Sequence, residues 1–417
     1  MDKMNKHQKI INDPVHGFMP IYNELVLAVI NHPVFQRLRR IKQLGLSDLV
    51  YPGALHTRFH HALGAMHLMR LALDTLRNKG HEITEEEYEG ALLAILLHDI
   101  GHSPFSHALE HSILDNIAHE KVSLLLMKYL NTIFDKKLNV AIQIFSNQYP
   151  KKFLHQLVSS QVDMDRLDYL QRDSFFTGVV EGNVGGDRII SMLEVRNDEI
   201  VWEEKAIYSI ESFLNARRLM YWQVYLHKTT VATEQMLIQA IRRAKFLVQN
   251  GENLQSMPAL AYFLDKKRGI EDFEKSIQVQ GTDSVFEHFI SLDDYDVLGS
   301  IKLWAKSTDK VLSQISNGLL QRNLFKTSLE NEKHSAEFIQ QKLQNVQKAG
   351  GFSAEEANFF VVHGVLSNAA YQAGSQKIKL LRKNGEITDI AEAADLPNIK
   401  AMSKIVKKYF LCYPKLV

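Results

Sequence analysis

The chain has 417 residues, which is enough for one large domain or two of ordinary size. Its composition, 45% hydrophobic and 23% charged, is typical of globular proteins. The chain has 49 basic and 48 acidic residues, so no overall basicity argues for a nucleic-acid partner, and only a local basic patch could bind one. With one cysteine, Cys412, no signal-peptide core and no run of about 18 apolar residues, we expect a cytoplasmic protein without intrachain disulfides or a membrane span.

The N-terminal part is predicted to begin with a hairpin or extended arm and then to become helical. Residues 1–21 hold a Pro/Gly turn between short β-prone stretches, in "INDPVHGFMPI". Residues 24–44 indicate two helices divided at His32–Pro33, because proline disfavours the helical conformation of the residue before it. Residues 60–80 and 84–101 have helical patterns; in the second, Thr84 and Glu87 form a capping box, and Gly101 is expected to stop the helix.

The remainder is predicted to be mainly α with two further hairpins. Helices are expected over residues 119–130, 159–174, 206–249, 253–265 and 310–348. Residues 188–207 alternate and turn at Asn197–Asp198, and residues 377–390 alternate around an Asn-Gly pair, so both stretches favour β-hairpins. A weak boundary near residue 250 divides a core of residues 1–250 from a mixed helical C-terminal region of residues 251–417.

The stretch "AILLHDIGHSPFSHALEH", residues 94–111, places several histidines and an aspartate after an apolar run. Buried histidine and aspartate need partners, and adjacent His98 and Asp99 can both reach one cation if their helix ends there. Two further ligands would come from other helices, and His61 and Asp165 are the candidates. A satisfied structural network without an ion is the alternative for a lone His-Asp pair.

The order His61, His98-Asp99, Asp165 resembles the HD superfamily of metal-dependent phosphohydrolases. Linked stretches are similar to its deoxynucleoside triphosphate (dNTP) triphosphohydrolase branch, which includes bacterial dGTPases and the human SAM- and HD-domain enzyme: "INDPVHG", "FQRLRRIKQLG", "YPGALHTRFHHALG", "LLHDIGHSPFSH" and "DMDRLDYLQRD". The likeness covers roughly residues 10–175, and no SAM domain is expected ahead of the core. It implies an HD-domain helical bundle whose four ligands hold a divalent ion, which could be Fe, Mn, Ni or Zn, while Mg could accompany the phosphates.

The resemblance also implies a reaction. A metal activates water, and attack at the α-phosphorus of a dNTP would release inorganic triphosphate and leave the deoxynucleoside. By resemblance, His107 and His119 lie against the phosphates, and His119 is our choice for the general acid, with Glu110 as its orienting carboxylate. The branch has aspartate at the Glu110 position. For His102, a catalytic role and a structural network are both open.

Substrate contacts are assigned in the same way. Arg58 and Arg166 would bind phosphate, Tyr169 would exclude a 2′-hydroxyl by stacking on the deoxyribose, and Asp173 would bond the 3′-hydroxyl. Weaker matches to sugar and base contacts are Gln43, Leu44, Tyr225 and His227. Without the resemblance, an Arg166–Asp173 surface pair with Tyr169 in the core would be the simpler interpretation.

A basic stretch, "FQRLRRIK", indicates either a solvated face or a regulatory nucleotide pocket at a subunit boundary. The second reading comes from the resemblance and concerns Lys9, Asn12, Asn31, Gln36 and Arg39. Asparagine at position 31 replaces an aspartate and weakens any preference for guanine, since a neutral acceptor makes weaker hydrogen bonds. Because the resemblance places this pocket at a subunit boundary, we expect a homo-oligomer, a tetramer or a dimer.

Two other functions stay open. One is a different HD phosphohydrolase, such as a nucleotidase, phosphodiesterase or guanosine-tetraphosphate hydrolase. The other is a non-catalytic nucleotide sensor, which an intact set of four metal ligands argues against. The products separate the three: inorganic triphosphate, orthophosphate, or none.

Overall fold

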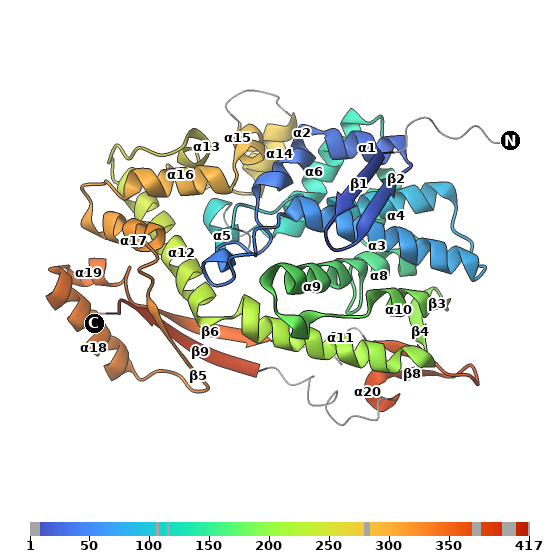
Figure 1. Ribbon diagram of the computed structural model, residues 1–417. Coiled ribbons are helices and arrows are strands. Elements are labelled where there is room, and N and C mark those ends of the chain that lie inside the picture. Colours follow the sequence, from blue (N-terminus) through green and yellow to red (C-terminus); the bar gives the residue numbers. More distant parts are fainter. Residues whose placement is uncertain are drawn as a thin grey trace.

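Two long apolar helices crossed by a third form the centre of the fold. The computed structural model describes residues 9–105, 108–114, 117–278, 284–368, 377–393 and 406–415. Helix α3 (Arg58–Asn78) lies beside α4 (Glu85–Leu97), and α9 (Met164–Thr177) packs across α3 (Figure 1). All residues of α4 from Gly90 onward are buried, as expected for a helix enclosed on every side. The predicted mainly α fold class is confirmed.

The end of α4 differs from its prediction. The helix ends at Leu97, before the HD motif, and Gly101 is not its C-cap. A Cβ at position 101 would lie only 2.3 Å from the backbone nitrogen of Ser123 in α6 (His119–Ile133), so glycine is needed there for close packing. The hydroxyl of Ser123 accepts from the Gly101 N–H at 2.9 Å and donates to the His98 carbonyl at 2.7 Å. Helix α6 therefore fixes the backbone of the HD motif.

The N-terminal hairpin is confirmed, and the two helices after it are shorter than predicted. Strands β1 (Lys9–Asp13) and β2 (Gly17–Ile21) pair antiparallel. They precede α1 (Glu24–Asn31), α2 (Pro33–Gln36) and the 3₁₀ turn η1 (Arg37–Arg40). Helical structure stops there because the next residues pair with the segment before α3: the Ile41 carbonyl accepts from Arg58 N–H at 2.9 Å, and Gln43 N–H donates to the His56 carbonyl at 3.0 Å.

The other helices of the predicted core surround the central three. Their bounds are α5 (Glu110–Ile113), α7 (Asn139–Phe145), α8 (Lys152–Val158), α10 (Gly186–Ser191), α11 (Ile207–Met220) and α12 (Lys228–Gln249). A short 3₁₀ turn, η4 (Val180–Gly182), follows α9. Helices α11 and α12 are joined by a π-helical turn, η6 (Tyr221–Tyr225), so the helix predicted over residues 206–249 is confirmed with one interruption.

Both remaining hairpins are confirmed, and they join into one sheet. Strands β3 (Leu193–Arg196) and β4 (Glu199–Glu203) are connected by Asn197 and Asp198, whose φ angles of 54° and 61° are those of a type I′ turn. Strands β7 (Lys379–Leu381) and β8 (Ile387–Asp389) form the second hairpin. Because β4 pairs parallel with β7, the sheet has the order β3-β4-β7-β8 and unites strands from both sides of residue 250.

Two helix predictions in the C-terminal region are wrong in part. Of residues 253–265, only α13 (Pro258–Ala261) is α-helical, and it begins with a proline that cannot continue an earlier turn. Residues 310–348 contain α17 (Lys310–Leu320) and most of α18 (Ala336–Gly350), but residues 326–330 between them form strand β5.

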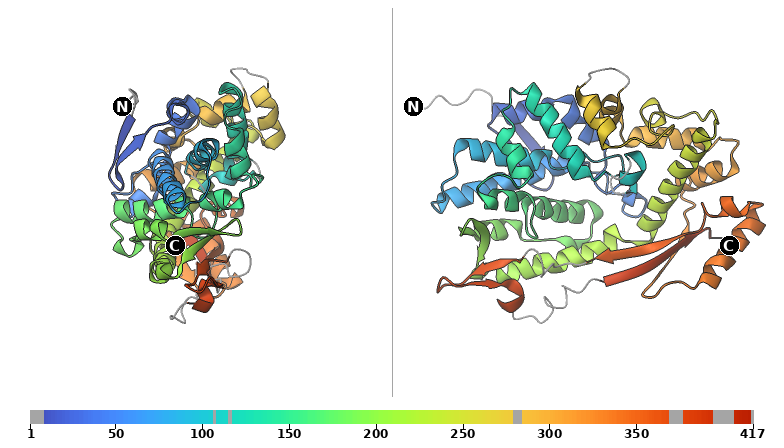
Figure 2. Two further views of the ribbon diagram at one scale, coloured as in Figure 1. Left: turned by 90° about the vertical axis from the view of Figure 1, so that its right-hand side faces the viewer. Right: turned by 180° about the vertical axis from the view of Figure 1, so that it is seen from behind.

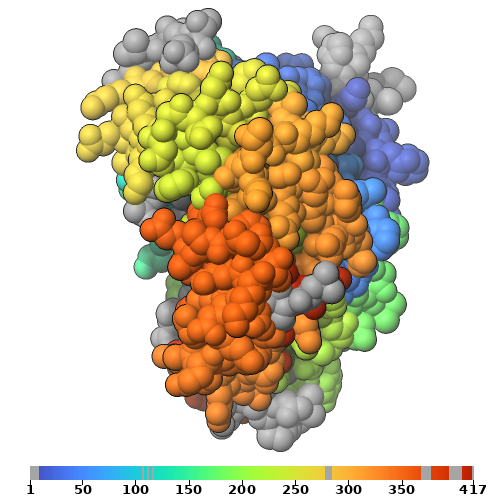
Figure 3. Space-filling view, turned by 90° about the vertical axis from the view of Figure 1, so that its left-hand side faces the viewer, coloured from blue at the N-terminus to red at the C-terminus, as the bar shows by residue number. Residues whose placement is uncertain are grey.

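Strand β5 belongs to a second, antiparallel sheet that the local pattern did not reveal. Its order is β5-β9-β6, with β9 (Val406–Tyr413) between β5 and β6 (Val362–Asn368). The remaining C-terminal helices are α14 (Ile270–Gln278), α15 (Val285–Ser291), α16 (Asp294–Trp304), α19 (Ala354–Ala357) and α20 (Ile390–Ala393). Helices α16 to α18 lie on the side of the molecule away from the N-terminal hairpin (Figure 2), where these yellow and orange segments adjoin over one face (Figure 3).

Among the described residues, no helix combines the length and the apolar character that crossing a lipid bilayer would require.

Candidate metal centre

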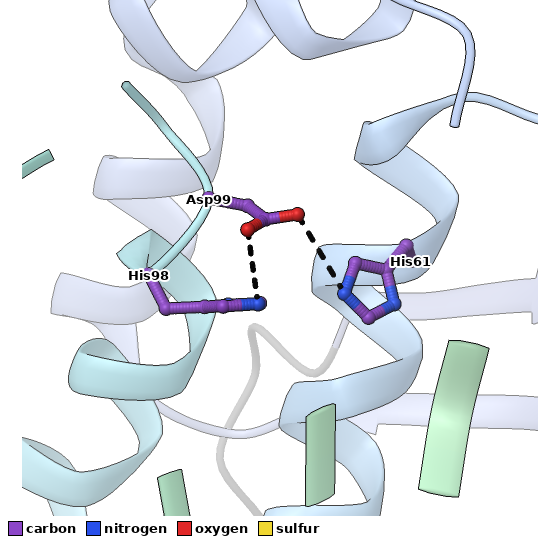
Figure 4. A group of neighbouring side chains, drawn as sticks. All are labelled: His61, His98 and Asp99. Atoms are coloured by element: carbon purple, nitrogen blue, oxygen red, sulfur yellow. Dashed lines mark ion pairs between the residues drawn. The ribbon is translucent and has the colours of Figure 1, made fainter. Parts of the chain in front are cut away.

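Four side chains predicted to bind metal meet where the three central helices approach one another. His61 lies in the first turn of α3, His98 and Asp99 directly follow α4, and Asp165 lies in the first turn of α9. Figure 4 shows the His61 imidazole facing the carboxylate of Asp99, with His98 beside that carboxylate. The structure thus brings together residues that are up to 104 positions apart in the sequence.

The distances suit ligands of one ion. The Nε2 atom of His61 lies 3.1 Å from Asp165 Oδ1 and 3.8 Å from Asp99 Oδ2. The Nε2 atom of His98 lies 3.4 Å from Asp165 Oδ1 and 3.3 Å from Asp99 Oδ1. Ligands that are each about 2.0–2.2 Å from a metal ion lie about 3.0–3.5 Å from one another, which is close to this spacing.

The hydrogen bonds of the two imidazoles place their protons on Nδ1 and leave both Nε2 atoms available to bind a metal ion. His98 Nδ1 lies 2.6 Å from the Ile95 carbonyl, which can only accept, so this nitrogen carries the proton. His61 Nδ1 is 2.7 Å from Asp168 Oδ2 and donates to it in the same way. The Nε2 atoms of both rings are buried and have no hydrogen-bond partner among the described residues. Two buried nitrogens of this kind, beside two carboxylates, form a donor set that fits a divalent ion.

The electrostatics of the cluster also favour a cation. Burial opposes protonation of His61, but the neighbouring carboxylates of Asp165 and Asp168 outweigh burial and raise its pKa. Burial raises the pKa of Asp165, yet the nearby imidazoles of His98 and His61 overcome it and lower the pKa well below the usual range. The carboxylates therefore stay ionised, and a metal ion competes with protons for the imidazoles, so that metal affinity increases with pH.

Asp168, to which the sequence analysis gave no role, supports this centre from behind. It is fully buried in α9 and bonds both His61 Nδ1 and His16 Nε2, each at 2.7 Å. Arg172 donates to the same carboxylate at 2.9 and 3.0 Å and binds Asp13 at 2.8 and 3.2 Å. A carboxylate that fixes the far nitrogen of a ligand histidine is a common device of metal sites.

Two signals could have indicated this support. Asp168 is three positions after Asp165 on the same predicted helix. Asp13 and His16 belong to "INDPVHG", one of the stretches that resemble the family. The N-terminal hairpin is therefore connected through Arg172 and Asp168 to a predicted metal ligand.

A second group of polar side chains adjoins the first through Asp99. His102 Nδ1 lies 3.3 Å from Asp99 Oδ1, and the rings of His102 and His119 are 3.8 Å apart at their centroids. Two predicted catalytic histidines are thus next to the metal ligands. Glu110 begins α5, but its side chain, like the whole of His107, lies outside the described residues.

The two cations predicted to bind phosphate are both held by carboxylates. Arg58 is buried at the start of α3 and forms an ion pair with Asp99. Arg166 pairs with the buried Asp163, which also caps α9 by accepting from the Arg166 N–H at 2.7 Å. Burial raises the pKa of Asp163 to about 6, although the charge of Arg166 opposes this. Arg58 thus contacts a predicted metal ligand directly, and Arg166 is held by Asp163, two positions before the predicted ligand Asp165.

The predicted sugar contacts form one polar and aromatic wall. The ring of Tyr169 is 6.4 Å from that of His61 and 6.2 Å from that of Tyr225. The Tyr225 hydroxyl donates to Asp173 Oδ2 at 2.7 Å, and His56 Nε2 lies 2.7 Å from Asp173 Oδ1. The π-helical turn η6 places Tyr225 here, and such turns are frequent at functional sites.

The other predicted contacts are more dispersed. Gln43 and Leu44 follow the segment that pairs with residues 56–58, and the buried Gln43 Oε1 has no hydrogen-bond partner among the described residues. His227 caps α12 and lies 6.2 Å from the ring of Tyr51, and no contact described here joins it to the cluster.

The predicted regulatory residues fall into two sets. Gln36 donates to the Ile30 carbonyl at 2.7 Å and accepts from Arg39 at 2.7 Å, while Arg39 stacks 3.6 Å above the ring of Phe59. Asn31 ends α1 close by in sequence. Lys9 and Asn12 lie on β1 and are joined to this set by no contact described here.

One member of the basic stretch has a structural role. Arg37 is buried and donates to the His102 carbonyl at 2.9 Å and to the Leu292 carbonyl at 2.8 Å. Asp294, two positions after Leu292, accepts from the backbone N–H groups of Lys42, at 2.8 Å, and Phe105, at 3.0 Å. The C-terminal region thus holds two segments that border the metal centre.

Comparison with known proteins gives consistent matches. The HD domain family matches residues 58–173, and an HD-associated region matches residues 184–262. The uncharacterized protein YwfO of Bacillus subtilis is 32% identical over 424 residues, which cover 98% of this chain and 92% of that protein. The deoxynucleoside triphosphate triphosphohydrolase SAMHD1 homolog of Dictyostelium discoideum is 28% identical and covers 78% of this chain and 68% of its own length. The crystal structure of a phosphohydrolase from Bacteroides thetaiotaomicron, 50% identical, superposes with a TM-score of 0.93 over 98% of this chain and all of that one.

Proposed function

Because the chain belongs to the family of HD-domain phosphohydrolases, we propose that it hydrolyses dNTPs to the deoxynucleoside and inorganic triphosphate. One observation carries the proposal most directly. The unpartnered Nε2 atoms of His61 and His98 converge with the carboxylates of Asp99 and Asp165 at ligand spacing. The dNTP class is supported by the matching relatives that are named dNTP triphosphohydrolases.

The four side chains would hold one divalent ion of the Fe, Mn, Ni or Zn type, since two imidazoles and two carboxylates suit these metals. Such an ion supplies activation of a water nucleophile and polarisation of a phosphoryl oxygen. Asp168 keeps the His61 proton on Nδ1, so that Nε2 stays directed at the ion.

The phosphates would be bound by the chain's own cations. Arg58 and Arg166 border the ligand cluster from opposite elements, and each can exchange its carboxylate partner for a phosphate oxygen. His119, whose ring centroid lies 3.8 Å from that of His102, would donate a proton to the leaving oxygen. An imidazole suits this role because it can both hold and release a proton.

Selection for a deoxyribose would come from Tyr169. Its ring lies 6.4 Å from that of His61 and 6.2 Å from that of Tyr225, so a sugar bound beside the metal centre would lie against it, and a 2′-hydroxyl would meet the ring. Asp173, already held by His56 and Tyr225, has lone pairs left for a 3′-hydroxyl.

The test is product analysis with each dNTP and NTP and added Mn, Fe, Ni, Zn or Mg. We expect inorganic triphosphate and deoxynucleoside from dNTPs and little turnover of NTPs. Asp99→Ala should lose metal and activity together, whereas Asp187→Ala, which removes an exposed carboxylate from α10, should lose neither. Release of orthophosphate would instead indicate a different HD phosphohydrolase, and no product with any metal would contradict a catalytic role.

A further inference from the structure

A second pocket, built from other residues, lies between the segment around α8 and the four-stranded sheet. Its volume is about 440 Å³, within the range of sites for small molecules. The side chains lining it come from the turn before α8, from α8, from residues 159–162, from β4 and from residues 377–379. None of the described residues in its walls is among the predicted metal, catalytic or substrate residues.

The charge of this pocket is positive. Three lysines line it, Lys152, Lys377 and Lys379, against a single carboxylate, Glu199. Glu199 forms an ion pair with Lys379, which neutralises both. Lys152 and Lys377 are exposed and form no side-chain ion pair with any described residue, although the Lys152 N–H donates to Asp198 Oδ2 at 2.9 Å. Both lysines line the pocket, and their ammonium groups have no direct carboxylate partner among the described residues.

The uncharged walls offer mainly hydrogen-bond donors. Gln156 uses its carbonyl to accept from the Ile200 N–H at 2.7 Å, so its free end is the NH₂ group. The hydroxyl of Ser160 and the indole N–H of Trp202, which is 3% exposed, are buried in the wall and have no hydrogen-bond partner among the described residues. A buried donor without a partner is costly, and an anion with several acceptor oxygens would relieve that cost after a small side-chain rotation.

We propose that this pocket binds a phosphate-bearing small molecule, independently of the metal centre. A phosphate group supplies the two things the walls lack, negative charge and multiple acceptor oxygens, and lysine binds it well as a point charge. The volume leaves room for more than one phosphate group.

The pocket adjoins the element that carries a predicted metal ligand. The Ser160 N–H donates to Asp163 Oδ2 at 2.7 Å, and Asp163 is the partner of Arg166 and lies two positions before Asp165. A bound phosphate would therefore act on the segment that opens α9. Any effect on turnover rests on the proposed function, whereas binding to the pocket does not.

The experiment is isothermal titration of the metal-loaded protein with inorganic triphosphate, a dNTP and deoxyadenosine. The wild type is compared with the double variant Lys152→Ala/Lys377→Ala, and with Arg166→Ala, which removes a cation of the metal centre instead. The matched control is Lys275→Ala/Lys302→Ala, which removes two exposed lysines from α14 and α16. Trp202→Phe keeps an aromatic ring in the wall and removes the N–H donor together with part of the indole.

We expect the double variant to bind triphosphate at least about tenfold more weakly at one class of site, which the control and Arg166→Ala retain. Trp202→Phe should weaken the same site by a smaller factor. Equal affinity for triphosphate and dNTP would place recognition in the phosphates alone, and tighter binding of the dNTP would add a contribution from the base or sugar. A wild type with only this one class of site would support the pocket and count against the phosphate contacts of the metal centre.

Two results would overturn the proposal. One is a double variant that binds triphosphate as the wild type and the control do. The other is deoxyadenosine binding as tightly as triphosphate, because recognition would then not depend on charge.

Discussion

Replacing Asp168 with asparagine removes the charge that orients His61 while keeping nearly the same shape. The native carboxylate is fully buried and accepts from His61, His16 and twice from Arg172. Removing one partner of a buried ion pair typically costs about 3–5 kcal/mol. Because Arg172 retains its two bonds to Asp13, we expect the free energy of unfolding to fall by about 3 kcal/mol, the lower end of that range.

The same substitution should weaken metal binding, because asparagine holds the His61 imidazole less strongly. Loss of such a supporting partner typically reduces metal affinity or activity by about 10- to 100-fold. The two effects are separated by measuring urea unfolding of metal-stripped protein and, separately, metal affinity under native conditions. Stripping is necessary because bound metal stabilises the native state by itself.

The control is Asp74→Asn, which also removes an aspartate paired with an arginine four positions away, in this case Arg70 on α3. Asp74 is partly exposed, so we expect a loss of at most about 1 kcal/mol and no change in metal affinity. The reasoning about Asp168 is refuted if Asp168→Asn unfolds at the wild-type urea concentration and binds metal within about threefold of the wild type.

Three further outcomes are expected. Gly64→Ala should lower the urea midpoint and the metal affinity together, because the alanine Cβ would lie 1.9 Å from Asp168 Oδ1. This is expected although alanine favours a helix more than glycine does. An unchanged midpoint would mean that α3 and α9 can move apart at no cost. Burial raises the pKa of Asp294 from 3.8 to about 6, so the stability it contributes is fully present below pH 3.8 and is lost as the pH rises through about 6. The unfolding free energy of wild type relative to Asp294→Asn should therefore fall by about 2.4 kcal/mol between pH 4 and 7, and a flat difference would contradict the shifted pKa. Tyr225→Phe should cost about 1–2 kcal/mol by leaving Asp173 short of a donor, as measured by chemical denaturation, and a variant as stable as wild type would show that water replaces the hydroxyl.

The parts of the fold that were predicted correctly are those specified by neighbouring residues. The capping box of Thr84 and Glu87 begins α4 as expected, and Asn197–Asp198 forms the turn that its residue types favour. The sheet β5-β9-β6 was missed because the partner of each strand lies tens of residues away in the sequence. Strand pairing of this kind is decided by tertiary contacts, which a local pattern does not contain.

The candidate site divides in a similar way. The order of histidines and aspartates, together with the family resemblance that it carries, named four side chains that the structure brings together. The support behind them was not foreseen, because Asp13 and Arg172 are 159 positions apart and show their relation only when the hairpin is folded against α9. The ion pair between Arg58 and Asp99 was not predicted either. Arg58 was assigned to a phosphate, and the sequence does not indicate which side chain the guanidinium pairs with when no substrate is bound.

The hydrogen bonds from Arg37 to Leu292 and from Lys42 to Asp294 have a consequence for how the protein is made. They join residues 255 and 252 positions apart, and they hold backbone segments that border the metal centre. During synthesis, α3, α4 and α9 emerge from the ribosome long before α16 does, so the nascent chain carries its predicted metal ligands while those segments are still unsupported. Contacts of such sequence separation form slowly, and chains of this size commonly pass through partly folded intermediates. We therefore expect a species truncated near residue 250 to collapse around its central helices yet to exchange the backbone amides of Lys42 and Phe105 rapidly with solvent.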